Sequence, residues 1–253
     1  MPAKTEKGSI NSIQKACRIL SCFSLENSSC NLTYLCNQTG FAKSTVYRIC
    51  NILVQEGFVH KSENGFQYTL TEKVFALGVA AAHGFDFKNV SQMYLNNLAQ
   101  NVRETASIFV ENNFERLCVA AVESPSEVRV VSQMGKSFPI YLGASGRVLL
   151  TWMDPDRREE YLRTLEENPP RDLTIPVQQL RQEIEDTRKR GYAVTYGERI
   201  PNTISIATPI FYSSNQHAAL TVSAPNTHLA GVKMVDAIEA IRETAKNINL
   251  QMQ

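Results

Sequence analysis

One short segment near the N-terminus, residues 41–51, concentrates side chains that can hydrogen-bond to nucleic acid. Ammonium, hydroxyl, guanidinium and amide groups occur together in it, on Lys43, Ser44, Thr45, Tyr47, Arg48 and Asn51. These are the group types that reach base edges and phosphates when a helix lies in a DNA major groove. The segment therefore predicts recognition of double-stranded DNA.

The segment that carries these residues has the pattern of a helix. Val46, Ile49 and Leu53 recur at helical spacing and form an apolar stripe. Ser44 has the chemistry of an N-cap, and Gly57 is a typical residue just past a helix end. We expect the polar side chains to lie on the exposed face of this helix.

Two shorter helices are predicted before this segment and a β-hairpin after it. Apolar spacing predicts a helix over 12–22, and Thr33 is positioned to cap a second helix that Gly40 ends. The alternating run 58–70 turns at residues 63–65, where Glu-Asn-Gly supplies the positive φ of a tight hairpin. Three helices and a hairpin in this order predict a winged helix-turn-helix. The wing would present Lys61, Asn64 and Gln67 to neighbouring phosphates or to the minor groove.

Residues 32–59 and 68–78 also carry a family signature. Their sequences, LTYLCNQTGFAKSTVYRICNILVQEGFV and YTLTEKVFALG, resemble the signature of the IclR family of bacterial regulators. The matching positions are Leu32, Leu35, Thr39, Gly40, Lys43, Ser44, Thr45, Val46, Arg48, Leu53, Gly57, Val59, Tyr68, Leu70, Leu77 and Gly78. The resemblance implies a DNA-binding transcription regulator that forms homodimers or homotetramers. Two winged helices related by a two-fold axis predict a palindromic operator.

The rest of the chain predicts an α+β domain with an antiparallel sheet. Strand-like runs at 105–112, 116–123 and 128–134 precede three helices, further strand-like runs and a final amphipathic helix. We therefore expect three parts: a winged helix-turn-helix DNA-binding domain over 1–78, a linker helix over 79–95 that is interrupted near Gly84, and an effector-binding domain over 96–253.

The second half resembles the same family in the segments 135–150, 188–210 and 218–225. The resemblance implies a GAF-like domain that binds a small organic acid, often aromatic or 2-oxo in character, in a pocket at one end of the sheet. Carried over position by position, the pocket residues are Gly143, Ala144, Ser145, Thr195, Thr203, Ser205, Thr221 and Ser223. The N–H groups of 143–145 would begin a helix and attract a carboxylate.

Four positions depart from the family pattern in these segments. Arg147 stands where lysine is usual, and Thr195 stands where an acidic residue is usual. Gly197 replaces a glutamate and Asn202 replaces a glycine. These departures favour a ligand different from the common ones of the family.

An enzyme is the main alternative. The sequence GASGR lacks the final glycine of a nucleophile elbow, and the histidines at 60, 83, 217 and 228 lie far apart in the sequence. No Walker loop, G-x-G-x-x-G or H-E-x-x-H motif occurs, so we expect no catalytic residues, cofactor or metal. A histidine or carboxylate with a perturbed pKa beside Ser145 would favour this alternative.

A winged helix that docks on a protein and ignores DNA is the second alternative. It predicts a neutral or acidic face on the third helix, whereas Lys43, Arg48 and Lys61 supply positive charge there. Residues 1–90 carry nine Lys and Arg against six Asp and Glu, which also favours a nucleic-acid partner.

Six cysteines occur, at 17, 22, 30, 36, 50 and 118, without a zinc-binding pattern. Because Cys17, Cys36 and Cys50 fall on apolar helix faces, we expect buried reduced thiols, with a redox switch as the alternative. No apolar run approaches the roughly 18–20 residues of a membrane span. The first dozen residues lack the apolar core of a signal peptide, so a cytoplasmic location is expected.

Overall fold

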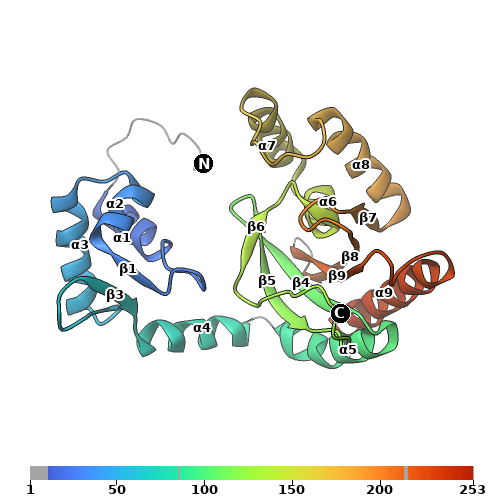
Figure 1. The fold of residues 1–253 in the computed structure, drawn as a ribbon, viewed down its shortest axis with the longest axis horizontal. Coiled ribbons are helices and arrows are strands. Elements are labelled where there is room, and N and C mark those ends of the chain that lie inside the picture. Colours follow the sequence, from blue (N-terminus) through green and yellow to red (C-terminus); the bar gives the residue numbers. More distant parts are fainter. Residues whose placement is uncertain (1–10, 85, 214–215, 253) are drawn as a thin grey trace. The chain divides into compact units, whose positions relative to one another are not determined.

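The computed structural model describes residues 11–84, 86–213 and 216–252. Contacts divide the chain after Gly84 into two compact units, each with its own hydrophobic core. In chain order the elements of the first unit are α1 (Ser12–Leu20), β1 (Ser29–Asn31), α2 (Leu32–Thr39), α3 (Lys43–Gln55), β2 (Val59–Lys61), β3 (Gln67–Leu70) and α4 (Glu72–Gly84) (Figure 1).

The first unit is a winged helix-turn-helix, as predicted. Helices α1, α2 and α3 pack around a core that includes Leu35, Val46 and Ile49, each almost fully buried. Each such aliphatic side chain contributes about 1.5–3 kcal/mol by leaving water. Gly40 adopts φ 70° and ends α2, and Gly65 adopts φ 74° at the tip of the wing, which is the left-handed backbone that glycine tolerates best.

Several local predictions in this unit are wrong. Helix α2 is capped by Asn31, not by Thr33, because the Asn31 Oδ1 atom accepts a hydrogen bond of 2.8 Å from the Tyr34 N–H. Helix α3 begins at Lys43 after Ala42, whose side chain offers no cap, so Ser44 lies inside the first turn. Cys17 is exposed, because α1 turns Ile19 into the core instead.

Polar residues such as those before α2 are typical of a turn, but the last three of them form the strand β1. Strand β1 pairs with β3, with Cys30 opposite Tyr68, and the sheet order is β1-β3-β2. Three residues of mixed polarity give no alternation that could predict this strand, because its pairing with β3 is a tertiary contact.

Two helices occupy the region expected to hold a linker. Helix α4 ends at Gly84, and α5 (Asp86–Val102) belongs to the second unit. The boundaries expected at 78 and 95 therefore fall inside α4 and α5, and the interruption expected near Gly84 involves residue 85, which lies outside the described residues.

The second unit is an α+β domain built on one antiparallel sheet, which confirms the predicted fold class. The sheet order is β6-β5-β4-β9-β8-β7. Its further elements are β4 (Thr105–Asn112), β5 (Glu115–Val122), β6 (Ser137–Pro139), α6 (Gly143–Trp152), α7 (Pro155–Glu167), α8 (Val177–Arg190), β7 (Ala193–Tyr196), β8 (Thr203–Ser213), β9 (Gln216–Pro225) and α9 (Val232–Gln251).

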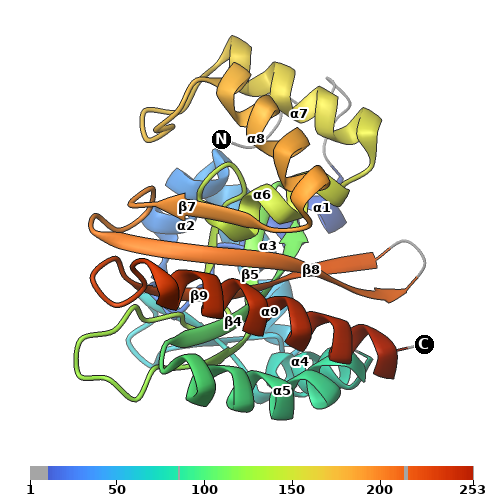
Figure 2. The same cartoon turned by 90° about the vertical axis from the view of Figure 1, so that its right-hand side faces the viewer.

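The sheet separates two layers of helices. Helices α5 and α9 cover one face, while α6, with α7 and α8 beyond it, covers the other (Figure 2). Asp154 caps α7, since its carboxylate accepts the Arg157 N–H at 3.0 Å. This arrangement places the N-terminus of α6 against β7, β8 and β9.

One predicted strand is absent from the described chain. Residues 128–134 form a loop, and β6 pairs with β5 instead. The loop turns Val130 and Ser132 inward, and the Thr105 hydroxyl donates a 2.6 Å hydrogen bond to the carbonyl of Val130. Val130 therefore packs inward from a loop and not from a sheet strand.

Candidate functional sites

The exposed face of α3 carries the donor residues that the sequence singled out. Lys43, Ser44, Tyr47 and Arg48 are exposed, and Thr45 and Asn51 are half-buried. The stripe of Val46, Ile49, Cys50 and Leu53 is buried on the opposite side of the helix. The predicted face therefore presents ammonium, hydroxyl and guanidinium groups to solvent along about two turns of helix.

The wing lies beside this face. The Lys61 ammonium is 5.3 Å from the centre of the Tyr47 ring, a cation–π contact that joins β2 to α3. Asn64 has a structural part in the turn, because its Oδ1 atom accepts hydrogen bonds from the Ser62 hydroxyl and the Phe66 N–H. Gln67 accepts a hydrogen bond from the Ser29 hydroxyl at 3.2 Å. Lys61 thus remains the wing residue whose charge adjoins α3.

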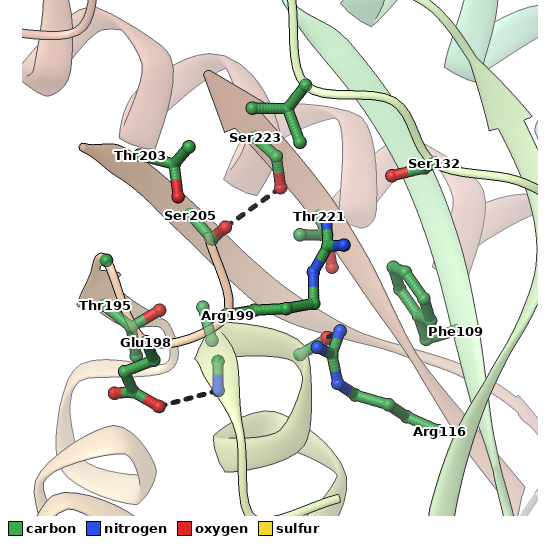
Figure 3. A pocket seen from close by; sticks show the side chains of 15 residues that line it. Phe109, Arg116, Ser132, Thr195, Glu198, Arg199, Thr203, Ser205, Thr221 and Ser223 are labelled. Carbon is green, nitrogen blue, oxygen red and sulfur yellow. Dashed lines mark hydrogen bonds between the residues drawn. The ribbon is translucent and has the colours of Figure 1, made fainter. Parts of the chain in front are cut away.

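In the second unit one cavity brings together residues from distant parts of the chain. All eight pocket positions carried over from the family line it: Gly143, Ala144, Ser145, Thr195, Thr203, Ser205, Thr221 and Ser223 (Figure 3). The cavity encloses about 430 Å³ between atoms, part of which is open to solvent.

The register of the sheet explains why these hydroxyls converge. Ser205 pairs with Ser223 across β8 and β9, and Thr195 on β7 pairs with Ser205. Since alternate residues of a strand face the same side, Thr203 and Thr221 join them on the side of α6. The Ser205 and Ser223 hydroxyl oxygens lie 2.9 Å apart and hydrogen-bond to each other.

The N-terminus of α6 closes one side of the cavity. A Cβ atom at Gly146 would lie 1.9 Å from the carbonyl oxygen of Ile140, so only glycine permits this close approach. The Gly143 N–H, expected to be free for a ligand, donates a 2.7 Å hydrogen bond to the Glu198 carboxylate. The N–H groups of Ala144 and Ser145 have no acceptor among the described residues. The helix N-terminus is therefore only partly occupied by the protein's own carboxylate.

Arg147, which departs from the family pattern, is fully buried and holds this corner together. Its guanidinium pairs with Glu183 on α8 at 2.7 Å and with Glu198 at 2.8 Å, and donates to the Tyr141 carbonyl. Both carboxylates are thereby engaged, which meets the cost of burying this charge. The network fixes the loop after β7 against α6.

Two further arginines enter the cavity, and neither was predicted from the sequence. Arg116 on β5 is 5% exposed and donates a 2.7 Å hydrogen bond to the Ser145 hydroxyl, while its Nε atom is buried without a partner. Arg199 follows Glu198 in the loop after β7. Figure 3 shows the two side chains reaching into the cavity from opposite sides. Both guanidiniums also lie within about 5 Å of the centre of the Phe138 ring.

The electrostatics of this pair are unusual for a protein interior. No carboxylate lies within ion-pair distance of Arg116 or Arg199 in the described part of the chain. Burial, and then the neighbouring charge of Arg199, lowers the pKa of Arg116 to about 9. Burial also lowers the pKa of Arg199. The cavity therefore holds two positive charges that an anion would stabilise.

This geometry does not match the enzyme alternative. That alternative called for a histidine or carboxylate beside Ser145, but the neighbour is Arg116, whose guanidinium has no acceptor and cannot serve as a general base. Among the described residues, no group of three or more His, Cys, Asp or Glu side chains is arranged to hold a metal ion.

Two buried thiols have the properties expected of structural cysteines. All six cysteines are free, and burial raises the pKa of Cys50 and of Cys118 to about 11. A raised pKa leaves little of the reactive thiolate.

Comparison with known protein families decides the family. Residues 79–250 match the family described as bacterial transcriptional regulator IclR C-terminal, and residues 12–63 match the IclR helix-turn-helix domain. The chain belongs to the IclR family. It is thus a transcription regulator with a DNA-binding helix-turn-helix and a C-terminal effector domain, and not an enzyme.

Named relatives of this IclR-family regulator have related functions. The chain is 26% identical over 246 residues to the HTH-type transcriptional regulator KdgR of Escherichia coli, covering 96% of this chain and 93% of the relative. It is 26% identical over 239 residues to the HTH-type transcriptional regulator KipR of Bacillus subtilis, covering 94% and 95%.

Solved structures share the fold. A putative IclR transcriptional regulator from Silicibacter sp. aligns with a TM-score of 0.86 at 21% identity, covering 96% of each chain. An IclR homologue from Microbacterium hydrocarbonoxydans, complexed with 4-hydroxybenzoate, aligns with a TM-score of 0.78 at 21% identity, covering 96% of this chain and 99% of that one. Within the described residues, no helix is both long and apolar enough to cross a membrane.

Proposed function

We propose that this regulator binds a palindromic DNA operator as a homo-oligomer and that a small organic acid in the cavity modulates the binding. The main support for the effector is the cavity itself. Its walls present two arginines that lack carboxylate partners, and they also present free N–H groups at the N-terminus of α6. Such a site favours a carboxylate. The 4-hydroxybenzoate bound by a structural neighbour is also an organic acid, which supports this ligand class.

The DNA side of the proposal rests on the exposed face of α3. The donors on this face would hydrogen-bond to base edges, while Lys61 and Asn64 on the wing would contact the sugar-phosphate backbone of the DNA. We assign DNA contact to Lys43, Ser44, Thr45, Tyr47, Arg48, Asn51, Lys61 and Asn64. The protein would act in the cytoplasm, where the operator is accessible.

Helix α4 supports the homo-oligomer. Phe75 is 74% and Leu77 is 52% exposed on α4, and Val79 is also exposed. Large apolar side chains gathered on one helix are typical of a surface that another chain covers. We propose a second copy as that chain, since a palindromic operator requires two winged helices related by two-fold symmetry.

Coupling between the two units follows from ligand linkage. An acid that binds one arrangement of the domains better than another shifts the population toward that arrangement, typically by about 1–3 kcal/mol. The segment 79–95, which joins the units, is proposed to transmit this shift. Either release from DNA or recruitment to DNA is compatible with this linkage.

Electrophoretic mobility shift tests the proposal directly. The purified protein is titrated onto DNA from its own upstream intergenic region, with and without a panel of aliphatic and aromatic carboxylic acids. We expect a specific shift that at least one acid alters. No shift on any DNA at low salt, where phosphate contacts are strongest, would reject DNA recognition. A shift that no acid changes would reject the effector assignment.

A further inference from the structure

We infer that the cavity selects a small ligand with two negative charges, either a dicarboxylate or a phosphate monoester, held between Arg116 and Arg199. The inference rests on the proposed effector function and specifies the charge of the effector. It is carried by two arginines that line the cavity without a carboxylate partner among the described residues, in contrast to those arginines of the same domain that are paired.

Several other arginines of this domain have carboxylate partners, and Arg158 and Arg188 donate to backbone carbonyls instead. Arg157 pairs with both oxygens of Glu111 at 2.8 Å, and Arg181 pairs with Glu159 and Glu166. Arg129, near the surface, pairs with Glu123 at 2.8 Å. Arg116 and Arg199 have no such partner among the described residues, although they are more buried than Arg129.

The nearby carboxylates are not available to these two arginines. Glu198 uses one oxygen for the Gly143 N–H and the other for Arg147, and Glu183 also pairs with Arg147. Glu183 and Glu198 therefore both pair with Arg147, and neither forms an ion pair with the guanidinium of Arg116 or Arg199. A ligand is the remaining source of negative charge.

The donors inside the cavity come from two sides, and each side carries one guanidinium. Arg116 lies with the Ser145 hydroxyl and the free N–H groups at the start of α6. Arg199 reaches in from the opposite side (Figure 3). A ligand with one negative charge would leave a net positive charge in the cavity, which is costly in a buried site. A ligand with two charges, or a phosphate whose oxygens face both sides, compensates both guanidiniums.

Calorimetric titration of the full-length protein with matched probes tests this inference. Succinate is compared with succinamate, which has a similar shape and one charge fewer. Glycerol 3-phosphate is compared with its methyl phosphodiester, which is monoanionic. Because a charge-assisted hydrogen bond accounts for roughly a tenfold to hundredfold change in affinity, we expect at least one dianion to bind about tenfold or more tightly than its matched monoanion. The pair that shows the difference identifies carboxylate or phosphate chemistry.

Substitutions at Arg199 test whether this residue binds the second negative charge of the ligand. Arg199→Gln is expected to reduce the dianion's affinity to that of the monoanion, and Arg199→Lys to retain part of the preference because it keeps a positive charge. Arg129→Gln, which removes a surface ion pair of the same domain, serves as the matched control and should keep the full preference. Circular dichroism checks that each variant is folded.

Three outcomes would overturn the inference. Equal affinity for the members of both pairs would show that one charge is sufficient, and equal weakening of both members by Arg199→Gln would give Arg199 no selective part. Absence of binding by all four probes would reject dianion selection as well. An acid that alters the mobility shift in any of these cases would leave the proposed effector function intact, so the two proposals can fail separately.

Discussion

The α3 face and the cavity both concentrate positive charge, but they hold it in different ways. On α3 the charges are exposed and come from one continuous segment, so water and salt screen them until a polyanion arrives. In and beside the cavity, Arg116, Arg147 and Arg199 come from three separate segments and are buried or half-buried. Exposed charge has little effect on folding and acts on a partner, whereas buried charge must be compensated within the fold or by a ligand.

This difference predicts opposite results for the removal of one arginine. For the buried, paired Arg147 the effect should appear in the stability of the fold. On α3 it should appear in DNA affinity alone. Substitutions at Arg147, Arg48 and Lys43 test this distinction, from the largest expected effect to the smallest.

The largest effect is expected for Arg147→Met. Removal of a fully buried guanidinium leaves Glu183 and Glu198 without their partner, which should lower the free energy of unfolding by about 3–5 kcal/mol. Urea denaturation of the second unit's transition measures this change. Arg129→Met, which breaks a surface pair, should cost about 0–1 kcal/mol. Equal losses in the two variants would contradict the distinction between buried and exposed charge.

Arg48→Ala comes next and should act on DNA binding. Loss of a base or phosphate contact is expected to weaken operator affinity by about 1–3 kcal/mol, measured by fluorescence anisotropy. The unfolding curve should stay unchanged, because Arg48 is exposed. A matched control is Lys189→Ala, on an exposed part of α8, which should leave DNA affinity as it was. Unchanged affinity in Arg48→Ala would reject its assignment to the operator contact.

Lys43→Ala should have a smaller and less sequence-dependent effect. A lysine that meets a phosphate contributes mainly through counterion release, so the slope of log affinity against log salt should fall by about 1. The measurement is a salt titration on operator and on unrelated DNA. A loss confined to the operator would instead indicate that Lys43 reads a base.

The smallest effect concerns pH and the buried Glu104 in the second unit. Glu104 lies 2.9 Å from His228, and burial raises its pKa above 4.5, an effect that the hydrogen bond with His228 partly offsets. Because the folded state holds this proton more tightly than the unfolded chain, the stability due to Glu104 falls as pH rises through the raised pKa. Glu104→Gln removes this dependence. Urea midpoints from pH 4.5 upward measure it, and parallel curves for the two proteins would contradict the prediction.

Local patterns were sufficient for the parts of the molecule whose geometry is local. The apolar stripe of α3 fixed which side of the helix faces solvent, and Gly40 and Gly65 marked the two turns. The same kind of reasoning was wrong where a tertiary contact intervened. Strand β1 exists because it pairs with β3, and the apolar run 128–134 became a loop held by Thr105.

For the cavity, the family resemblance of the sequence was sufficient to name eight residues, and the structure shows that all eight line the same cavity. A weak signal for Arg116 existed, since it alternates with Cys118 on a strand that is otherwise apolar. Glu198 had no signal for its contact with Gly143, because 55 residues separate them.

The sequence by itself determined the family, the winged helix and the exposed donors of α3, because helical periodicity and short motifs act between near neighbours in the chain. The tertiary structure alone decided which charges are compensated. In the folded chain Glu183 and Glu198 form ion pairs with Arg147, while Arg116 and Arg199 face the cavity without a carboxylate partner among the described residues. The physical reason is that burial and ion pairing depend on which distant segments the sheet register brings together, and no local pattern records that register.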